Sequence, residues 1–252
     1  MKIAFVYPGQ GAQYVGMGKD LFEAYPDLKD IYLKADNILG FELSSVSFEG
    51  PAEKLKQTYV TQPAIFTHSV CLTKILGKKL SADFAAGHSL GEYSALVYAG
   101  ALTFDEGLKL VKLRGELMQK AGEQQKGTMA AIMGLGPQKL EELCREASSA
   151  GIVQVANFNS PGQIVISGSV DGVRKAMELA REAKAKLVKE LLYNQLTSSV
   201  RWEESITNMI HDGAEEFVEI GPGKVLQGLI KRIDGNVAVR GFDKAEDLNK
   251  LE

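Results

Sequence analysis

The stretch that decides the fold is residues 83–100, DFAAGHSLGEYSALVYAG. Residues 83–86 are predicted as a short strand, and residues 92–99 as a helix that Gly100 closes. Between them, residues 87–91 fit the pattern G-x-S-x-G, which places a serine on a sharp turn from a strand into a helix. Strands that alternate with helices in this way indicate an α/β fold with a mostly parallel sheet.

The same alternation continues on both sides of this stretch. Residues 3–7, IAFVY, are apolar throughout, as expected of a strand buried on both faces, and the PGQG run at 8–11 ends it. Further elements of this large subdomain are predicted as helices at 19–25, 26–39, 63–76, 104–121, 200–211 and 225–233, and as strands at 216–220 and 237–239. A parallel sheet places its ligands at the carboxyl ends of the strands.

The pattern changes at residue 126. From there the predicted order is strand 128–133, helix 137–148, strand 152–156, strand 163–167, helix 170–182 and strand 186–191. This βαββαβ order is the ferredoxin-like unit, which is complete in itself. The sequence therefore predicts a ferredoxin-like small subdomain at residues 126–191, inserted into a large α/β subdomain at residues 1–125 and 192–252.

Composition excludes several classes of function. The chain has 252 residues, a net charge of -3, two cysteines and three histidines. It lacks the overall basic charge that draws proteins to nucleic acid or anionic membranes. No apolar run suggests a transmembrane helix or a signal peptide, so we expect a cytoplasmic protein that binds neither nucleic acid nor a membrane. Cys71 and Cys144 stand alone, which argues against a metal site and favours two ordinary buried thiols.

Ser89 is the candidate nucleophile. The turn would project its hydroxyl into a cleft and aim the backbone amide of Leu90 at a developing oxyanion, close to the positive end of a helix. The alternative is a plain strand-to-helix turn. The glycine-rich loop at 8–13 lacks the features of a phosphate loop, and the side chain of Gln10 could instead donate to the oxyanion. The run GPGKV at 221–225 is predicted to be a tight turn before a helix.

Arg114 is the second candidate. At offsets of minus four, plus three and plus four it shares a helical stripe with Leu110, Leu117 and Met118, so its stem is expected against the apolar face. A buried guanidinium needs an anion. From the spacing alone, an internal Asp or Glu, a carboxylate of a substrate, and extension of the side chain to solvent all stay open.

No histidine is an evident base for Ser89. His88 precedes the serine, so the two side chains should point apart, and it is expected to be structural. His68 lies within a helix without a motif. His211 is expected at the surface, in the last turn of a helix, where a cation interacts favourably with the helix dipole.

Taken together, these residues resemble the malonyl-CoA:acyl carrier protein transacylase family, the acyltransferases of fatty acid synthesis. The motifs lie in the family's order over nearly the whole chain. They are FVYPGQG at 5–11, TQPA at 61–64, GHSLGE at 87–92, LRG at 113–115, NFNSPGQ at 157–163, YNQLT at 193–197 and EIGPGKVL at 219–226.

The resemblance implies an α/β-hydrolase-like large subdomain with a ferredoxin-like small one. Ser89 would take the malonyl group from malonyl-CoA, its substrate, and pass it to the phosphopantetheine thiol of acyl carrier protein, its partner. Gln10 and the Leu90 amide would form the oxyanion hole, Arg114 would hold the malonyl carboxylate, and the Gln195 carbonyl would orient the catalytic histidine. No permanently bound cofactor and no metal are implied, and a monomer is expected.

The family's catalytic histidine has no counterpart in this sequence. In the family it follows the last strand of the small subdomain, whereas here residues 189–192 run directly into Tyr193-Asn194-Gln195, so a segment of several tens of residues is absent. Three hypotheses follow: a malonyl transferase, slow or inactive because it lacks this base; a serine esterase of the α/β-hydrolase class, which would not explain Arg114; and an impaired remnant that binds without turnover.

Overall fold

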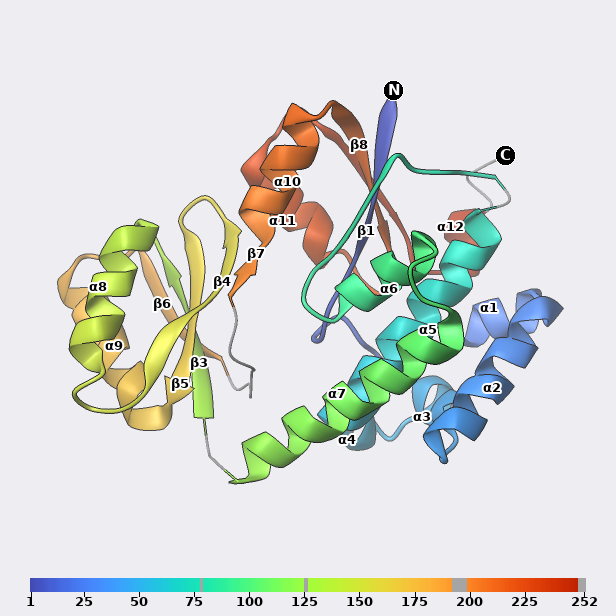
Figure 1. The fold of residues 1–252 in the computed structure, drawn as a ribbon, viewed down its shortest axis with the longest axis horizontal. Coiled ribbons are helices and arrows are strands. Elements are labelled where there is room, and N and C mark those ends of the chain that lie inside the picture. Colours follow the sequence, from blue (N-terminus) through green and yellow to red (C-terminus); the bar gives the residue numbers. More distant parts are fainter. Residues whose placement is uncertain (78, 125–126, 192–198, 249–252) are drawn as a thin grey trace. The chain divides into compact units, whose positions relative to one another are not determined.

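The computed structural model describes residues 1–77, 79–124, 127–191 and 199–248. It divides into two compact units: unit 1 comprises residues 1–117 and 208–252, and unit 2 comprises residues 118–207. Figure 1 shows the elements of each unit. The predicted boundaries at 126 and 191 enclose the ferredoxin-like elements and stay a prediction.

Unit 1 is built on a parallel sheet, which in the described part of the chain has the strand order β2-β1-β8-β9. The bounds of these strands are β1 (Lys2–Tyr7), β2 (Phe84–Gly87), β8 (Ala214–Ile220) and β9 (Ala238–Phe242). All three neighbouring pairs run parallel, with Val6 opposite Ala86 and Tyr7 opposite Gly87. Because every strand runs the same way, the residues that follow them leave from one edge of the sheet.

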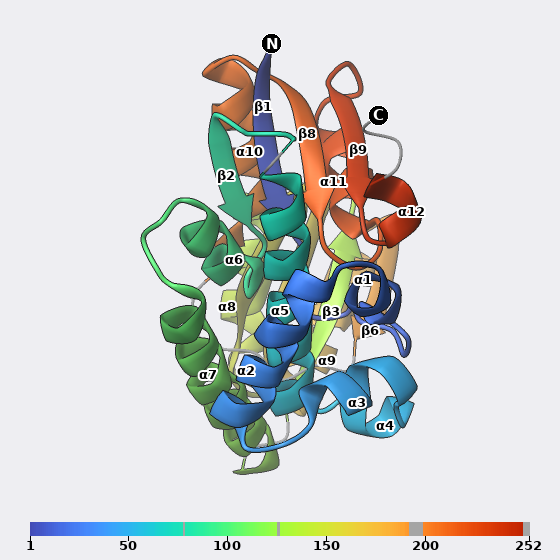
Figure 2. The ribbon, with the colours of Figure 1, turned by 90° about the vertical axis from the view of Figure 1, so that its right-hand side faces the viewer.

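Helices cover both faces of this sheet. Figure 2 shows α5 and α6 on one face and α11 on the other. The helices of unit 1 are α1 (Lys19–Ala24), the 3-10 helix η1 (Pro26–Leu28), α2 (Lys29–Leu39), α3 (Leu43–Glu49), α4 (Ala52–Leu55), α5 (Thr58–Leu76), α6 (Gly91–Tyr98), α11 (Val225–Ile233) and α12 (Ala245–Leu248). The side chains of Phe5, Tyr7, Val218 and Ile220 are fully buried, as a sheet covered on both faces requires.

Unit 2 contains the ferredoxin-like arrangement. Its elements are β3 (Gly127–Met133), α8 (Pro137–Ala147), β4 (Val153–Ser160), β5 (Gln163–Ser169), α9 (Val170–Glu182) and β6 (Leu187–Leu191), with the short β7 (Val200–Arg201) added beside β4. Over the described residues the strand order is β6-β3-β5-β4-β7, and the first four are antiparallel neighbours. The predicted fold class, a large subdomain with a mostly parallel sheet and a βαββαβ small one, is confirmed.

Helical periodicity explains how unit 2 forms its core. The buried positions of α8 are Leu140, Leu143, Cys144 and Ala147, and the buried positions of α9 include the same spacing at Val173, Ala176, Met177 and Ala180. This spacing puts one apolar stripe on each helix, and Figure 1 shows both helices on the same face of the sheet. The stripes pack against β-strand residues that include Ala130, Ile132, Val155, Ile164 and Ile166.

Two helices contain the sequence positions at which one unit ends and the other begins: α7 (Phe104–Gln124) and α10 (Trp202–His211). The predicted helix at 200–211 begins two residues late because Val200 and Arg201 pair with β4. The predicted helix at 63–76 begins earlier, at Thr58, so that Pro63 lies inside it. No helix in the described ranges is long and apolar enough to cross a membrane.

Candidate active site

Ser89 lies on a tight turn between β2 and α6. Its φ of 53° is in the left-handed region, which few residues other than glycine adopt. A Cβ on Gly87 would lie 1.8 Å from the carbonyl carbon of Gly91, and a Cβ on Gly91 would lie 2.0 Å from the carbonyl oxygen of Tyr7. Only glycine fits at both positions, so the two glycines of G-x-S-x-G allow the close packing that the turn needs.

Arg114 of α7 lies beside this serine. Its Nη2 donates a hydrogen bond of 3.0 Å to the Ser89 hydroxyl oxygen. Burial lowers the pKa of Arg114, while nearby Tyr93 and Glu92 act in the opposite direction. The guanidinium is half-buried, and among the described side chains no carboxylate forms an ion pair with it. Of the three options left open by the sequence, an internal Asp or Glu partner is therefore not found.

The predicted stripe around Arg114 is partly wrong. Leu110 and Leu117 are 44% and 54% exposed, whereas Met118 is buried. The buried line of α7 has a different phase, and Arg114 lies at its border, which gives the guanidinium both a desolvated stem and access to Ser89. This line consists of Leu108, Val111, Gly115 and Met118.

Gln10 follows β1 and is held by α5. Its Nε2 donates to Thr58 Oγ1 at 3.3 Å, and its Oε1 accepts from Gln62 Nε2 at 3.3 Å. A Cβ on Gly9 would lie 2.6 Å from the carbonyl oxygen of His88, so the Gln10 loop approaches the turn that carries Ser89. Nothing in the sequence gave Thr58 a role, and Gln62 stood out only as part of the TQPA motif.

Of the other two predicted site residues, the structure describes Leu90 but not Gln195. Leu90 is the N-cap of α6, and its side chain is fully buried, so its place between the serine and the helix is fixed. The role of its amide in an oxyanion hole stays a prediction. Gln195 lies outside the described residues, and the role expected for its carbonyl also stays a prediction.

The histidines have separate environments. His211 is 89% exposed at the end of α10, as expected for a surface residue. His88 lies with its ring beside Gly9. His68 is fully buried in α5, with its Nε2 3.0 Å from Asp243 Oδ1. The sequence did not reveal this last contact, because 175 residues separate the two side chains.

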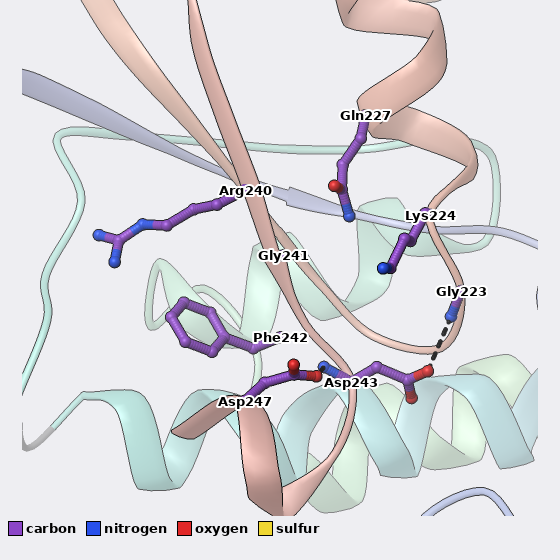
Figure 3. Close-up of a pocket in the computed structure, with 8 residues that line it drawn as sticks. All are labelled: Gly223, Lys224, Gln227, Arg240, Gly241, Phe242, Asp243 and Asp247. Atoms are coloured by element: carbon purple, nitrogen blue, oxygen red, sulfur yellow. Dashed lines mark hydrogen bonds between the residues drawn. The ribbon is translucent and has the colours of Figure 1, made fainter. Parts of the chain in front are cut away.

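A cavity of about 240 Å³ lies elsewhere in unit 1, and Figure 3 shows the residues that line it, from the turn before α11, from α11, from β9 and from the segment that follows β9. They are Gly223, Lys224, Gln227, Arg240, Gly241, Phe242, Asp243 and Asp247. None of the predicted site residues lines this cavity. In the part of the chain that the structure describes, no group of three His, Cys, Asp or Glu side chains could hold a metal ion.

Comparison with known proteins gives a consistent result. The acyl transferase domain family matches residues 4–195. The malonyl CoA-acyl carrier protein transacylase of Bacillus subtilis (strain 168) is 42% identical over 92% of this chain and 90% of its own length. That alignment runs over 287 positions, so about 55 of them have no residue in this chain. This number agrees in size with the absent segment expected from the motifs.

Solved structures agree with the relatives in sequence. The crystal structure of an acyl carrier protein S-malonyltransferase from Vibrio cholerae has a TM-score of 0.94, 35% identity and 100% coverage of both chains. A malonyl-transacylase in complex with its type II PKS acyl-carrier protein has a TM-score of 0.92 and 31% identity, covering 100% of this chain and 99% of that one. The chain therefore belongs to the acyl transferase domain family, among the malonyl CoA-acyl carrier protein transacylases.

Proposed function

We propose that this chain transfers a malonyl group from malonyl-CoA to the thiol of an acyl carrier protein through an ester on Ser89. The observation that carries the proposal is the contact between Arg114 and Ser89. A half-buried guanidinium, with no carboxylate oxygen within the 4.0 Å of an ion pair among the described residues, lies 3.0 Å from the candidate nucleophile. Its planar fork suits a carboxylate on the acyl group, and malonyl carries one.

The reaction would proceed in two balanced steps. In the first, the Ser89 oxygen attacks the thioester carbonyl, the carbon–sulfur bond breaks, and coenzyme A leaves as a thiol with the serine proton. In the second, the carrier protein's thiol attacks the serine ester, and Ser89 recovers its proton. The amide of Leu90 and the side chain of Gln10 would stabilise the oxyanion of both tetrahedral intermediates.

We expect the proton transfers to and from Ser89 to be the slow events of this reaction. His68 is engaged with Asp243, and His211 is exposed. The family's histidine motif is missing from the sequence, and a general base typically contributes ~10²–10⁴-fold. We therefore expect the chain to load malonyl slowly while Arg114 still binds the carboxylate.

A protein that binds malonyl-CoA without turnover is the second candidate, favoured because Arg114 lies beside Ser89 while the family's histidine motif is missing from this sequence. The test is to mix the chain with malonyl-CoA and follow the adduct on Ser89 by mass spectrometry, with Ser89→Ala as the control, and then to add acyl carrier protein. Loading followed by transfer supports the proposal. Saturable binding with no adduct in either protein supports the second candidate.

A further inference from the structure

Asp243 connects three parts of unit 1 that are distant in sequence. Its Oδ1 accepts a hydrogen bond of 3.1 Å from the hydroxyl of Tyr14 and lies 3.0 Å from His68 Nε2. Its Oδ2 accepts a 3.2 Å hydrogen bond from the backbone amide of Gly223, which Figure 3 shows as a dashed line. The Asp243 side chain is 17% exposed and the His68 side chain is fully buried, so these hydrogen bonds form in a largely desolvated place.

One of these partners, Tyr14, belongs to the same loop as Gln10. Burial and the neighbouring Asp243 both raise the pKa of Tyr14, so its phenol stays protonated and remains a donor. Another partner, His68, belongs to α5, the helix that supplies Thr58 and Gln62 to the amide of Gln10. The loop after β1 is therefore attached to α5 twice, once directly at Gln10 and once through Tyr14 and Asp243.

This loop approaches the turn that carries Ser89 at backbone distance. Neither Gly9 nor Gly91 has room for a Cβ. A Cβ on Gly9 would lie 2.6 Å from the carbonyl oxygen of His88, and a Cβ on Gly91 would lie 2.0 Å from that of Tyr7. With no slack between the loop and the turn, a displacement of the loop changes where Gln10 lies relative to Ser89. A displacement of about 1 Å can cost 10²-fold in rate.

We infer that Asp243 is a positioning residue, which acts through Tyr14 to fix the Gln10 loop against the Ser89 turn. The inference rests on the proposed function for the role of Gln10. It assigns to the residue that follows β9, the strand at the other edge of the sheet from β2, an effect on the chemistry at Ser89.

The first test does not depend on activity. The side-chain amide resonances of Gln10, assigned with Gln10→Ala, are followed by NMR in Tyr14→Phe, Asp243→Asn and Tyr98→Phe. Tyr98→Phe is the matched control, because its hydroxyl also bonds to backbone atoms in unit 1, at Ala82. We expect the Gln10 resonances to shift in the first two variants and to stay in place in the control. No shift in those two variants, or an equal shift in Tyr98→Phe, would overturn the inference.

The second test measures acylation of Ser89 by malonyl-CoA. Tyr14→Phe should lower the maximal rate about five- to tenfold, the size of one net hydrogen bond, and leave the half-saturating concentration unchanged because Arg114 is untouched. In the Gln10→Ala background the same change should have less than a twofold effect, whereas full additivity would contradict action through Gln10. If the unmodified chain shows no acylation, the proposed function fails, and the NMR result alone decides on Asp243.

Discussion

The guanidinium of Arg114 donates to the hydroxyl of Ser89 over 3.0 Å, from a helix that begins fifteen residues after that serine. The contact brings the two predicted site residues together before any substrate is present. It also means that a substrate carboxylate, to reach the Arg114 fork, must enter directly beside the nucleophile.

Removing the guanidinium should therefore slow the loading of acyl groups that carry a carboxylate much more than the loading of those that do not. We expect Arg114→Ala to lower malonyl loading of Ser89 by about 10–100-fold, the range for losing a hydrogen bond to a charged group. Loading from acetyl-CoA should change far less. Lys109→Ala removes a cation from the exposed face of the same helix and serves as the control. Equal losses for malonyl and acetyl would favour the esterase hypothesis instead.

The absolute rate is a separate prediction. We expect malonyl loading of the unmodified chain to be ~10²–10⁴-fold slower than that of the Bacillus subtilis relative measured side by side, because a general base is missing. Rapid quenching followed by mass spectrometry gives both rates. Loading of this chain within a factor of ten of the relative would contradict the prediction.

The glycines of the turn should be sensitive to a single methyl group. Gly91→Ala places a Cβ 2.0 Å from a backbone oxygen, so the backbone of β1 or α6 must move. We expect a loss of more than about 3 kcal/mol in the free energy of unfolding in urea, at the upper end of single substitutions. Gly228→Ala is the control, since no atom lies within 4 Å of its Cβ position in α11, and it should stabilise the protein by roughly 0.5–1 kcal/mol.

The raised pKa of Glu219 predicts that the free energy of unfolding falls as the pH rises. It is fully buried in β8, and although it accepts hydrogen bonds from the amides of Leu226 and Gln227, burial raises its pKa from 4.5 to about 7. An acid whose pKa is higher in the folded state favours folding when protonated. The stabilisation by protonated Glu219 is therefore fully present below pH 4.5 and is lost as the pH rises through 7. The free energy of unfolding should fall by on the order of 3 kcal/mol over this range.

The measurement for Glu219 is the free energy of unfolding against pH for the unmodified chain and for Glu219→Gln. The glutamine cannot ionise and keeps one acceptor oxygen, so it loses one of the two amide hydrogen bonds at every pH, and the pH-dependent part of the difference reports on the carboxyl. The difference between the two proteins should grow in favour of the variant between pH 4.5 and 8. Parallel curves over this range would show that the carboxyl titrates at its ordinary pKa.

The elements that sequence alone predicted well have strong periodicity. The stripes of α8 and α9 and the apolar run of β1 are set by side chains within one element, so they are visible without tertiary information. The sequence predicted fewer of the elements whose bounds depend on tertiary packing. Helices α3, α4 and α12 are seven, four and four residues long, too short for a stripe. At the start of α5, Pro63 suggested a first turn, but residues 60–72 are buried and extend the helix past it.

In the candidate site, too, features set by a local motif could be predicted from the sequence, and features set by tertiary contacts could not. Ser89 and its glycines follow from a local motif, and their turn has the strained geometry that the motif requires. The contact to Arg114 and the phase of its helix needed the structure, because two of the four expected stripe positions are exposed and a third, Arg114 itself, lies at the border of the buried line. The group of Tyr14, His68 and Asp243 has no local signal at all, since its members come from three distant segments.

The position of β2 in its sheet has a consequence for how the protein loses function. Within the described residues, β2 pairs with β1 alone, whereas β1 and β8 each have neighbours on both sides. An edge strand of four residues can open without disturbing the rest of the sheet, at a free energy below that of global unfolding. Because β2 leads directly into the turn of Ser89, such a local opening dislodges the nucleophile first. We therefore expect reactivity at Ser89 to disappear on warming at a lower temperature than the far-UV circular dichroism signal of the folded chain.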